Sequence, residues 1–169
     1  MNPEPRTILL VEDDAREAEL TLAALIEFNS VSRVAVVSDG EQALDYLRRR
    51  GKFETRPAGN PAVVLLDLKL PKVSGLEVLK RMRADPELKT IPVIIFSSSR
   101  AESDLIEGYR EGANGYVVKP LDFFAFMKAV KGLATFWAII NEPPPAFLEE
   151  QPIVHNGNLA RHETSGAVK

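Results

Sequence analysis

Five short apolar runs are spaced along the chain, and a segment with helical periodicity follows each of them. The runs place apolar side chains at successive positions, which is typical of strands buried on both faces of a parallel sheet. The predicted strands are 7–11, 33–37, 62–66, 92–96 and 115–118. The predicted helices are 14–28, 40–50, 74–83, 101–111 and 121–140, and 51–60 is predicted as a loop because it holds two glycines and one proline.

The alternation of strand and helix, repeated five times, specifies a parallel sheet with helices on both faces. We therefore predict a doubly wound α/β fold, although the pattern alone leaves the strand order open. Ser74 is a candidate N-cap for the third helix, and Glu77 completes a capping-box pattern there. In doubly wound sheets ligands bind beyond the carboxyl ends of the strands, where the strand order reverses. The polar residues that follow the predicted strands are therefore the candidate site.

Composition narrows the class of protein. The chain has 169 residues, of which 45% are hydrophobic, enough for one well-cored domain and short for two. The net charge of −3 and a single basic cluster, Arg48–Arg50, at a predicted helix end argue against a nucleic-acid surface. The absence of cysteine excludes disulfides and thiolate chemistry. No apolar segment is expected to span a membrane and the amino terminus does not resemble a signal peptide, so a cytoplasmic location is expected.

Four polar clusters follow predicted strands. Glu12, Asp13 and Asp14 follow the first, Asp67 the third, Ser97 ends the fourth, and Lys119 follows the fifth. Each has an ordinary explanation when it is taken singly. An acidic run suits a helix N-terminus, an aspartate after a strand is often an N-cap, a serine run forms polar loops, and Lys-Pro begins turns. Their coincidence on one edge of one sheet is what favours a functional site.

The chemistry of these residues is coherent. Carboxylates of Glu12, Asp13 and Asp67 held close together repel one another unless a cation is present. Oxygen-only ligands suit Mg²⁺, which keeps several waters and shares its shell with a phosphate. Lys119 offers a positive charge to a phosphoryl oxygen, and Ser97 offers a hydroxyl. A carboxylate nucleophile that forms an aspartyl phosphate is an established covalent strategy, and Asp67 is the candidate.

Four segments that contain these residues resemble the receiver domain family of two-component signalling. They are ILLVEDD at 8–14, VLLDLKLPKVSG at 64–75, IIFS at 94–97 and GYVVKP at 115–120. The resemblance covers residues 6–140. It implies a flavodoxin-like three-layer sandwich, (βα)5, with parallel strand order 2-1-3-4-5. It also implies that a histidine kinase donates the phosphoryl group.

The resemblance also assigns roles residue by residue. Asp67 would accept phosphate from a phosphohistidine, and Mg²⁺ would be held by Glu12, Asp13, Asp67 and the backbone carbonyl of Lys69. Ser97 and Lys119 would bind the phosphoryl group, the rotamer of Tyr116 would follow Ser97, and the bond before Pro120 would be cis. Asp14 would begin or cap the first helix. The departures are small: Glu12 replaces a commoner aspartate, Ser97 a commoner threonine, and Ser74 stands where many relatives have aspartate.

A narrower resemblance is to the response regulators that partner bacterial phytochromes. It is carried by Glu12, by the loop at 51–60, and by the segment FFAFMKAVKGLATFW at 123–137, where the pair Phe136 and Trp137 is the most suggestive feature. A bacteriophytochrome is therefore the expected kinase partner.

The chain is divided into a receiver domain at 1–141 and a Pro-rich, then polar tail at 142–169, too short for an output domain with its own core. Output is therefore expected through protein contacts. His155 and His162 of the tail are interpreted as solvated. The last helix carries more apolar residues than one sheet-facing stripe needs, which predicts a homodimer through this helix, the fifth strand and the preceding helix. Phe147 and Leu148 are candidates to extend that contact as an arm.

Three hypotheses on function remain. The leading one is a stand-alone signalling switch that is not an enzyme in the ordinary sense, although it catalyses its own phosphorylation and dephosphorylation at Asp67. The second is a phosphatase with an aspartyl nucleophile, which usually needs an acid two residues after the nucleophile, where this chain has Lys69. The third is a receiver that acts only as a scaffold. Retention of the polar residues at the strand ends argues against it.

Overall fold

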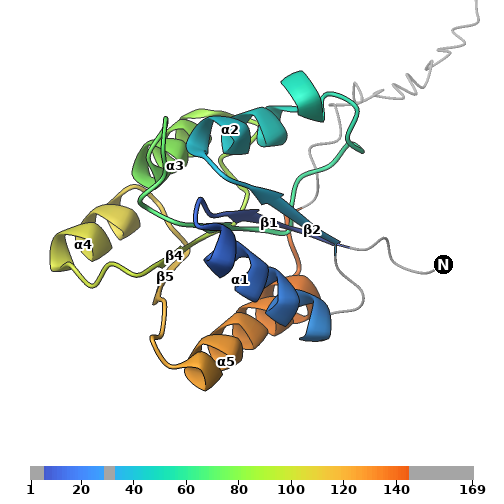
Figure 1. Cartoon of the computed structure of the whole chain (residues 1–169). Helices are drawn as coiled ribbons and strands as arrows, with labels where there is room; N and C mark the ends of the chain where they lie inside the picture. The colour runs from blue at the N-terminus through green and yellow to red at the C-terminus, as the bar shows by residue number, and fades with distance from the viewer. Residues whose placement is uncertain (1–5, 29–32, 145–169) are drawn as a thin grey trace, which may run out of the picture.

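The computed structural model of the protein describes residues 6–28 and 33–144 (Figure 1). The strands are β1 (Thr7–Val11), β2 (Arg33–Val37), β3 (Val63–Leu66), β4 (Val93–Ser97) and β5 (Gly115–Val118). The helices are α1 (Ala15–Phe28), α2 (Gly40–Arg48), α3 (Gly75–Ala84), α4 (Glu102–Arg110) and α5 (Phe123–Ala134). A short 3₁₀ turn, η1 (Gly51–Phe53), follows α2, and a π-helical turn, η2 (Thr135–Ile140), continues α5.

The five strands form one parallel sheet in the order β2-β1-β3-β4-β5, which confirms the predicted topology. In Figure 1, α2 and α3 lie over one face of the sheet and α1 and α5 over the other. The arrangement is therefore the predicted three-layer sandwich. The order reverses between β1 and β3, so the carboxyl ends of these two strands flank the position where doubly wound sheets bind ligands.

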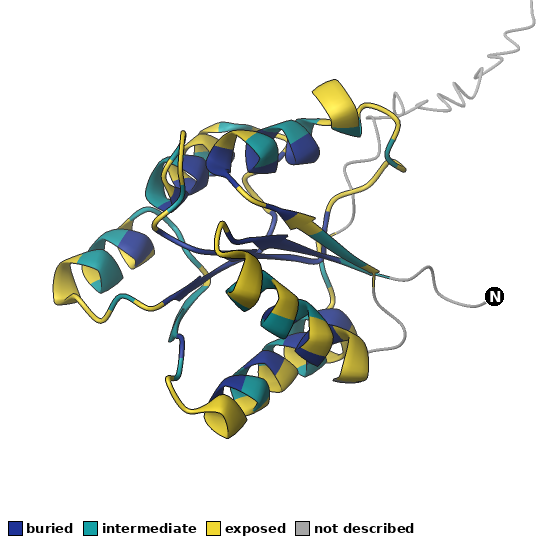
Figure 2. Cartoon of the chain, viewed as in Figure 1, coloured by how far each residue is buried: buried dark blue, intermediate teal, exposed yellow. Residues whose placement is uncertain are grey.

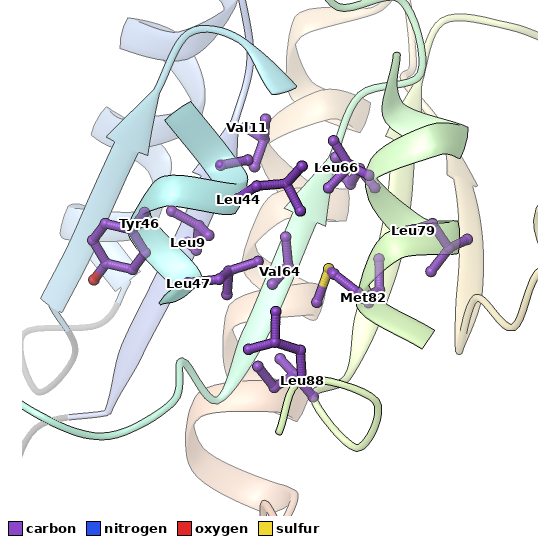
Figure 3. Close-up of a cluster of buried hydrophobic side chains, with 14 of the residues drawn as sticks. Leu9, Val11, Leu44, Tyr46, Leu47, Val64, Leu66, Leu79, Met82 and Leu88 are labelled. Atoms are coloured by element: carbon purple, nitrogen blue, oxygen red, sulfur yellow. The ribbon is translucent and has the colours of Figure 1, made fainter. Parts of the chain in front are cut away.

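Alternate strand residues fill two separate cores, because successive side chains in a strand point to opposite faces. One core packs strand residues such as Leu9 and Val64 against α2 and α3 (Figure 3). The other packs Ile8, Leu65 and Phe96 against α1 and α5. Figure 2 shows buried central strands, a partly exposed β2 at the edge of the sheet, and helices that are buried only on their inner sides. The nearly continuous apolar runs of β1, β3 and β4, as predicted, are what two covered faces require.

Local capping explains where the helices begin. Asp14 accepts hydrogen bonds from the backbone N–H groups of Arg16 and Glu17, so it is the N-cap of α1, as predicted. Ser74 accepts from Glu77 N at 3.3 Å and caps α3. The Glu77 carboxylate pairs with Arg81. Most predicted helix bounds therefore hold within one or two residues.

Two predicted helix bounds differ by two residues from the structure, and one predicted loop contains a short helical turn. Helix α2 ends at Arg48 because Arg49 adopts a left-handed conformation, with φ of 54°, that closes the helix. The loop predicted at 51–60 contains η1. The last helix begins at Phe123 rather than at 121, since Asp122 is its N-cap and accepts from Ala125 N at 2.8 Å. Leu121 lies outside the helix and is almost fully exposed.

The segment Phe123–Ile140 is long and apolar enough to cross a membrane by length and composition, so the expectation that no segment meets that test was wrong. Four of its residues, Phe126, Val130, Ala134 and Ala138, are buried in the core beneath the sheet. These four residues cover the sheet, whereas other apolar residues of the segment, among them Phe124 and Ile140, are exposed. Residues 145–169, including Phe147, Leu148, His155 and His162, lie outside the described residues.

Candidate functional site

The strand register places the predicted site residues at one edge of the sheet. Val11 is paired with Leu66, and Asp67 N donates to Val11 O at 3.1 Å, so Glu12 and Asp67 follow paired positions of β1 and β3. On the other side of β3, Ser97 ends β4, and its carbonyl accepts from Lys119 N at 2.8 Å. The convergence expected from parallel strands is therefore present.

Three carboxylates meet at this edge. Glu12, Asp13 and Asp67 each offer an oxygen, and these oxygens all lie within 4.8 Å of one another. Glu12 and Asp67 are buried, with 3% and 9% of their surface exposed, whereas Asp13 is exposed. One Asp67 oxygen, Oδ1, accepts from Leu68 N at 2.7 Å. The other, Oδ2, faces the Lys119 ammonium at 3.3 Å. Asp67 is thus held in a fixed orientation, with one oxygen bound by Leu68 N and the other directed toward the Lys119 ammonium.

Lys119 is the buried counter-charge of the cluster. Its Nζ contacts Glu12 Oε2 at 2.5 Å, Glu17 Oε2, and Asp67 Oδ2. Burial by itself lowers the pKa of Lys119, but the hydrogen bonds to Glu12 and Glu17 outweigh it and raise that pKa above its ordinary value. Lys119 is therefore charged at neutral pH. Burial raises the pKa of Glu12, and the hydrogen bond from Lys119 offsets only part of this rise.

The charge balance of the cluster fits a divalent cation. One ammonium neutralises one of the carboxylates of Glu12, Asp13 and Asp67, and the remaining negative charge is partly buried. Hard divalent cations such as Mg²⁺ and Mn²⁺ favour oxygen ligands of this kind. The donor set of this site therefore fits the metal that the sequence predicts. The predicted fourth ligand, the carbonyl of Lys69, stays a prediction.

The loop after Asp67 is pressed against the helix that follows it. Gly75 opens α3, and its N–H donates to Leu68 O at 2.9 Å. A Cβ atom at Gly75 would lie 2.1 Å from the Asp67 carbonyl oxygen, so no side chain fits there. The Ser74-Gly75 pair of the sequence thus caps α3 and allows the close approach that fixes Asp67.

Ser97 and Tyr116 are linked through the loop that follows β4. Ser97 is almost fully buried, and its Oγ accepts from Ser99 N at 3.3 Å. The Tyr116 hydroxyl donates to Ser99 O at 3.1 Å, and Ser99 Oγ donates to Asp104 of α4. Movement of Ser97 would therefore be transmitted to Tyr116 and α4 through Ser99. The predicted coupling of the Tyr116 rotamer to Ser97 has a physical route, although the coupling itself stays a prediction.

One residue of the cluster was missed from the sequence. Glu17 lies in the first turn of α1 and contacts the Lys119 ammonium. A glutamate in a first helical turn is usually explained by the helix dipole, which conceals such a contact. The sequence feature that could have indicated this contact is the position of Glu17, one helical turn after the predicted cap Asp14.

The cis bond predicted before Pro120 was wrong: all peptide bonds of the described residues are trans. The trans isomer is favoured by about 0.5–1 kcal/mol at X–Pro bonds, and the prediction was based on family resemblance alone.

A cleft of about 420 Å³ lies at the opposite, amino-terminal edge of the sheet. Its lining includes Arg6, Arg33 and Arg56 but none of the acidic cluster. Arg56 is already engaged there, because its guanidinium donates to the carbonyls of Tyr46 and Leu47 at the end of α2. This cleft is thus separate from the candidate phosphoryl site.

The chain is similar to known signalling proteins over most of its length. The sequence model of one protein family, the response regulator receiver domain, matches residues 8–131 of this chain. A curated relative, the response regulator Rcp1 of Synechocystis sp., is 36% identical over 136 residues, which cover 80% of this chain and 90% of Rcp1. A crystal structure of an Mn²⁺-bound response regulator Rcp1 is 34% identical, with a TM-score of 0.77, and the match covers 83% of this chain and 99% of that one.

Two further solved structures are of response regulators of phytochromes. The bacteriophytochrome response regulator RtBRR is 55% identical, with a TM-score of 0.67, over 84% of this chain and 86% of that one. The phosphorylated cyanobacterial phytochrome response regulator RcpA is 36% identical, with a TM-score of 0.77, over 83% of this chain and 99% of that one. A family match across 8–131, together with the acidic cluster at the carboxyl edge, shows that the chain belongs to the response regulator receiver domain family.

Proposed function

We propose that the protein is a phosphorylation-dependent signalling switch that accepts a phosphoryl group from a histidine kinase onto Asp67. The observation that carries this proposal is the convergence of Glu12, Asp13 and Asp67 on one point beside the buried ammonium of Lys119. A nucleophile, a cation site and a fixed positive charge are the parts that phosphoryl transfer needs, because its catalysis is mainly positioning and charge neutralisation.

The residues divide the chemistry among themselves. Asp67 Oδ2 forms the new bond to phosphorus while the bond from phosphorus to the donor histidine nitrogen breaks, and that nitrogen keeps the electron pair. Lys119 donates to a phosphoryl oxygen, and the Ser97 hydroxyl donates to another. A divalent cation held by Glu12, Asp13 and Asp67 would neutralise negative charge on the phosphoryl oxygens. Acylphosphate hydrolysis at the same site would return the protein to its resting state.

The kinase partner is proposed to be a bacteriophytochrome. The support is similarity to RtBRR and RcpA, which are described as phytochrome response regulators. The aromatic pair that suggested the same family is formed in the structure, since the rings of Phe136 and Trp137 lie edge to face at 5.0 Å.

The phosphatase alternative has weaker support. Lys69 occupies the position where such enzymes usually carry a second acid, and its side chain is exposed. A lysine at that position replaces the carboxyl group that such enzymes use as their general acid and base. The scaffold alternative leaves the buried cluster of Glu12, Asp67 and Lys119 without a purpose, although buried charges are costly to maintain.

The test is incubation with Mg²⁺ and acetyl phosphate, followed by intact-mass spectrometry. We expect a single phosphate adduct that forms only with a divalent cation and is lost at high pH, as an acylphosphate is. Turnover of an external phosphoester such as p-nitrophenyl phosphate would favour the phosphatase. If no adduct formed under any of these conditions, the phosphorylation model would be abandoned in favour of the scaffold.

We also propose that the protein forms a homodimer through α4, β5 and α5. Large apolar side chains remain exposed on these helices, among them Ile106, Tyr109, Phe123 and Phe124, more than the scattered residues of an ordinary surface. Phe124 is 79% exposed although it belongs to a helix whose other face covers the sheet. Such a surface is stabilised by burial against a second copy.

The dimer prediction concerns the change Phe124→Thr. Sedimentation equilibrium is expected to show a dimer for the unchanged protein and a weaker dimer, or a monomer, for the variant, because the exposed ring is lost. The control is Val36→Thr, which removes an exposed apolar group from β2 at the far edge of the sheet and should leave the mass unchanged. Monomeric behaviour of the unchanged protein at high concentration, with and without beryllofluoride, would refute the dimer.

A further inference from the structure

The ammonium of Lys119 has a third carboxylate partner that the phosphorylation chemistry does not need. Lys119 Nζ contacts Glu12, Asp67 and Glu17. Glu12 and Asp67 belong to the acidic cluster that fits a cation, whereas Glu17 is outside that cluster. Glu17 comes from α1, and its carboxylate is 43% exposed, in contrast to the buried carboxylates of the other two.

Local structure fixes Glu17 in this position. Asp14 caps α1 by accepting a hydrogen bond from Glu17 N at 3.0 Å, so the backbone of the first turn is held at the edge of the sheet. Asp14 N in turn donates to Glu12 Oε1 at 3.0 Å. The chain from Glu12 to Glu17 thus presents two carboxylates to the same ammonium. The contact is a consequence of how the helix begins and involves no long flexible loop.

The contacts of Lys119 leave no hydrogen for an incoming phosphoryl group. An ammonium group has three N–H donors, and here three carboxylates surround it. Before the new bond forms, an incoming phosphoryl group can bind Lys119 only if one of these contacts is released. Asp67 is the nucleophile and must stay in place, so the choice is between Glu12 and Glu17. Glu12 is buried and would lose its counter-charge, whereas Glu17 can turn into solvent and be hydrated. Release of Glu17 is therefore the least costly exchange.

We propose that Glu17 is a positioning residue that competes with the phosphoryl group for Lys119 and so slows phosphorylation of Asp67. This inference rests on the proposed phosphorylation and names a regulator of the same site. In the resting state Glu17 holds the ammonium toward α1 and adds a negative charge at the edge that the anionic donor approaches. On phosphorylation, Lys119 exchanges Glu17 for a phosphoryl oxygen, and the first turn of α1 loses an ion pair.

The first experiment compares Glu17→Gln with the unchanged protein. The rate of adduct formation with acetyl phosphate at saturating Mg²⁺ is expected to rise about threefold, as suits a half-exposed ion pair. The matched control is Glu19→Gln, which removes the same charge from an exposed position on the same helix. Glu19 has no polar side-chain contact within the described residues, and its variant should react at the original rate. Equal rates for Glu17→Gln and the unchanged protein, or equal acceleration by both variants, would overturn the proposal.

A second measurement reads the ion pair without phosphorylation. A double-mutant cycle of Glu17→Gln and Lys119→Met, followed by urea unfolding without metal, is expected to show favourable coupling. If Lys119→Met does not fold, Lys119→Gln replaces it in the cycle. Zero coupling would overturn the role of Glu17 even if Asp67 were phosphorylated. Failure of the unchanged protein to form an adduct, with the coupling present, would instead refute the proposed function.

Discussion

Asp67→Asn is expected to reduce the phosphate adduct at least a hundredfold, below detection by intact-mass spectrometry. An amide oxygen is a far weaker nucleophile than a carboxylate, and the change also removes one of the three charges that favour the divalent cation. The fold should persist, because Asn has nearly the same shape and its Oδ1 can still accept from Leu68 N. Lys119 would keep its contacts with Glu12 and Glu17.

Asp14→Asn is the matched control for this change. Asp14 neighbours the cluster and carries the same charge, but its carboxylate caps α1 through Arg16 N and Glu17 N. Asn is also a good N-cap, so this variant should keep both the fold and the adduct. An undiminished adduct in Asp67→Asn would show that phosphate attaches elsewhere. Loss of the adduct in both variants would point to general electrostatics rather than to one nucleophile.

The site could be located from the sequence because the carboxyl ends of all strands in a parallel sheet lie at the same edge. Once strands 7–11 and 62–66 are predicted as parallel neighbours, Glu12 and Asp67 must follow them at the same edge. Their convergence needs no knowledge of side-chain conformation. The strand order itself was beyond the hydrophobic pattern, and the family resemblance supplied it.

Features that depend on side-chain competition could not be predicted in this way. The contact between Glu17 and Lys119 depends on where α1 begins and on which carboxylate reaches the ammonium. The assignment of buried and exposed faces in the last helix is a second such feature. Val130 is buried whereas Phe124 is exposed, and a run of apolar residues does not specify which face covers the sheet. The isomer before Pro120 is decided by local energies that spacing does not encode.

The close approach of backbone at Gly75 is equally invisible in the sequence, where a glycine after Ser74 is simply the first residue of a helix. In the structure it is the only residue type that fits. A Cβ atom there would lie 2.1 Å from Asp67 O and 2.8 Å from Leu68 Cα, and both are backbone atoms that cannot rotate away. Since no left-handed φ is recorded for Gly75, the constraint is space and not backbone conformation.

Gly75→Ala is therefore expected to lower the free energy of unfolding by about 3 kcal/mol, the upper range for overpacking a buried site. The methyl group must push the Asp67 carbonyl or the start of α3 aside, and either shift displaces the carboxylate. We expect the rate of adduct formation to fall more than tenfold, measured beside urea unfolding of the same protein. The loss of rate should persist at temperatures where the variant is fully folded, because the displacement exists in the folded state.

Gly132→Ala separates this effect from the general cost of replacing glycine. Gly132 is exposed in α5, and a Cβ atom there would meet nothing within 4 Å. Alanine is favoured over glycine inside a helix by about 0.5–1 kcal/mol, so this variant should be slightly more stable and should react at the original rate. The two substitutions add the same methyl group and should change stability in opposite directions. If Gly75→Ala were as stable and as reactive as the unchanged protein, the loop after Asp67 would have to be free to move, and Asp67 would not be held by α3.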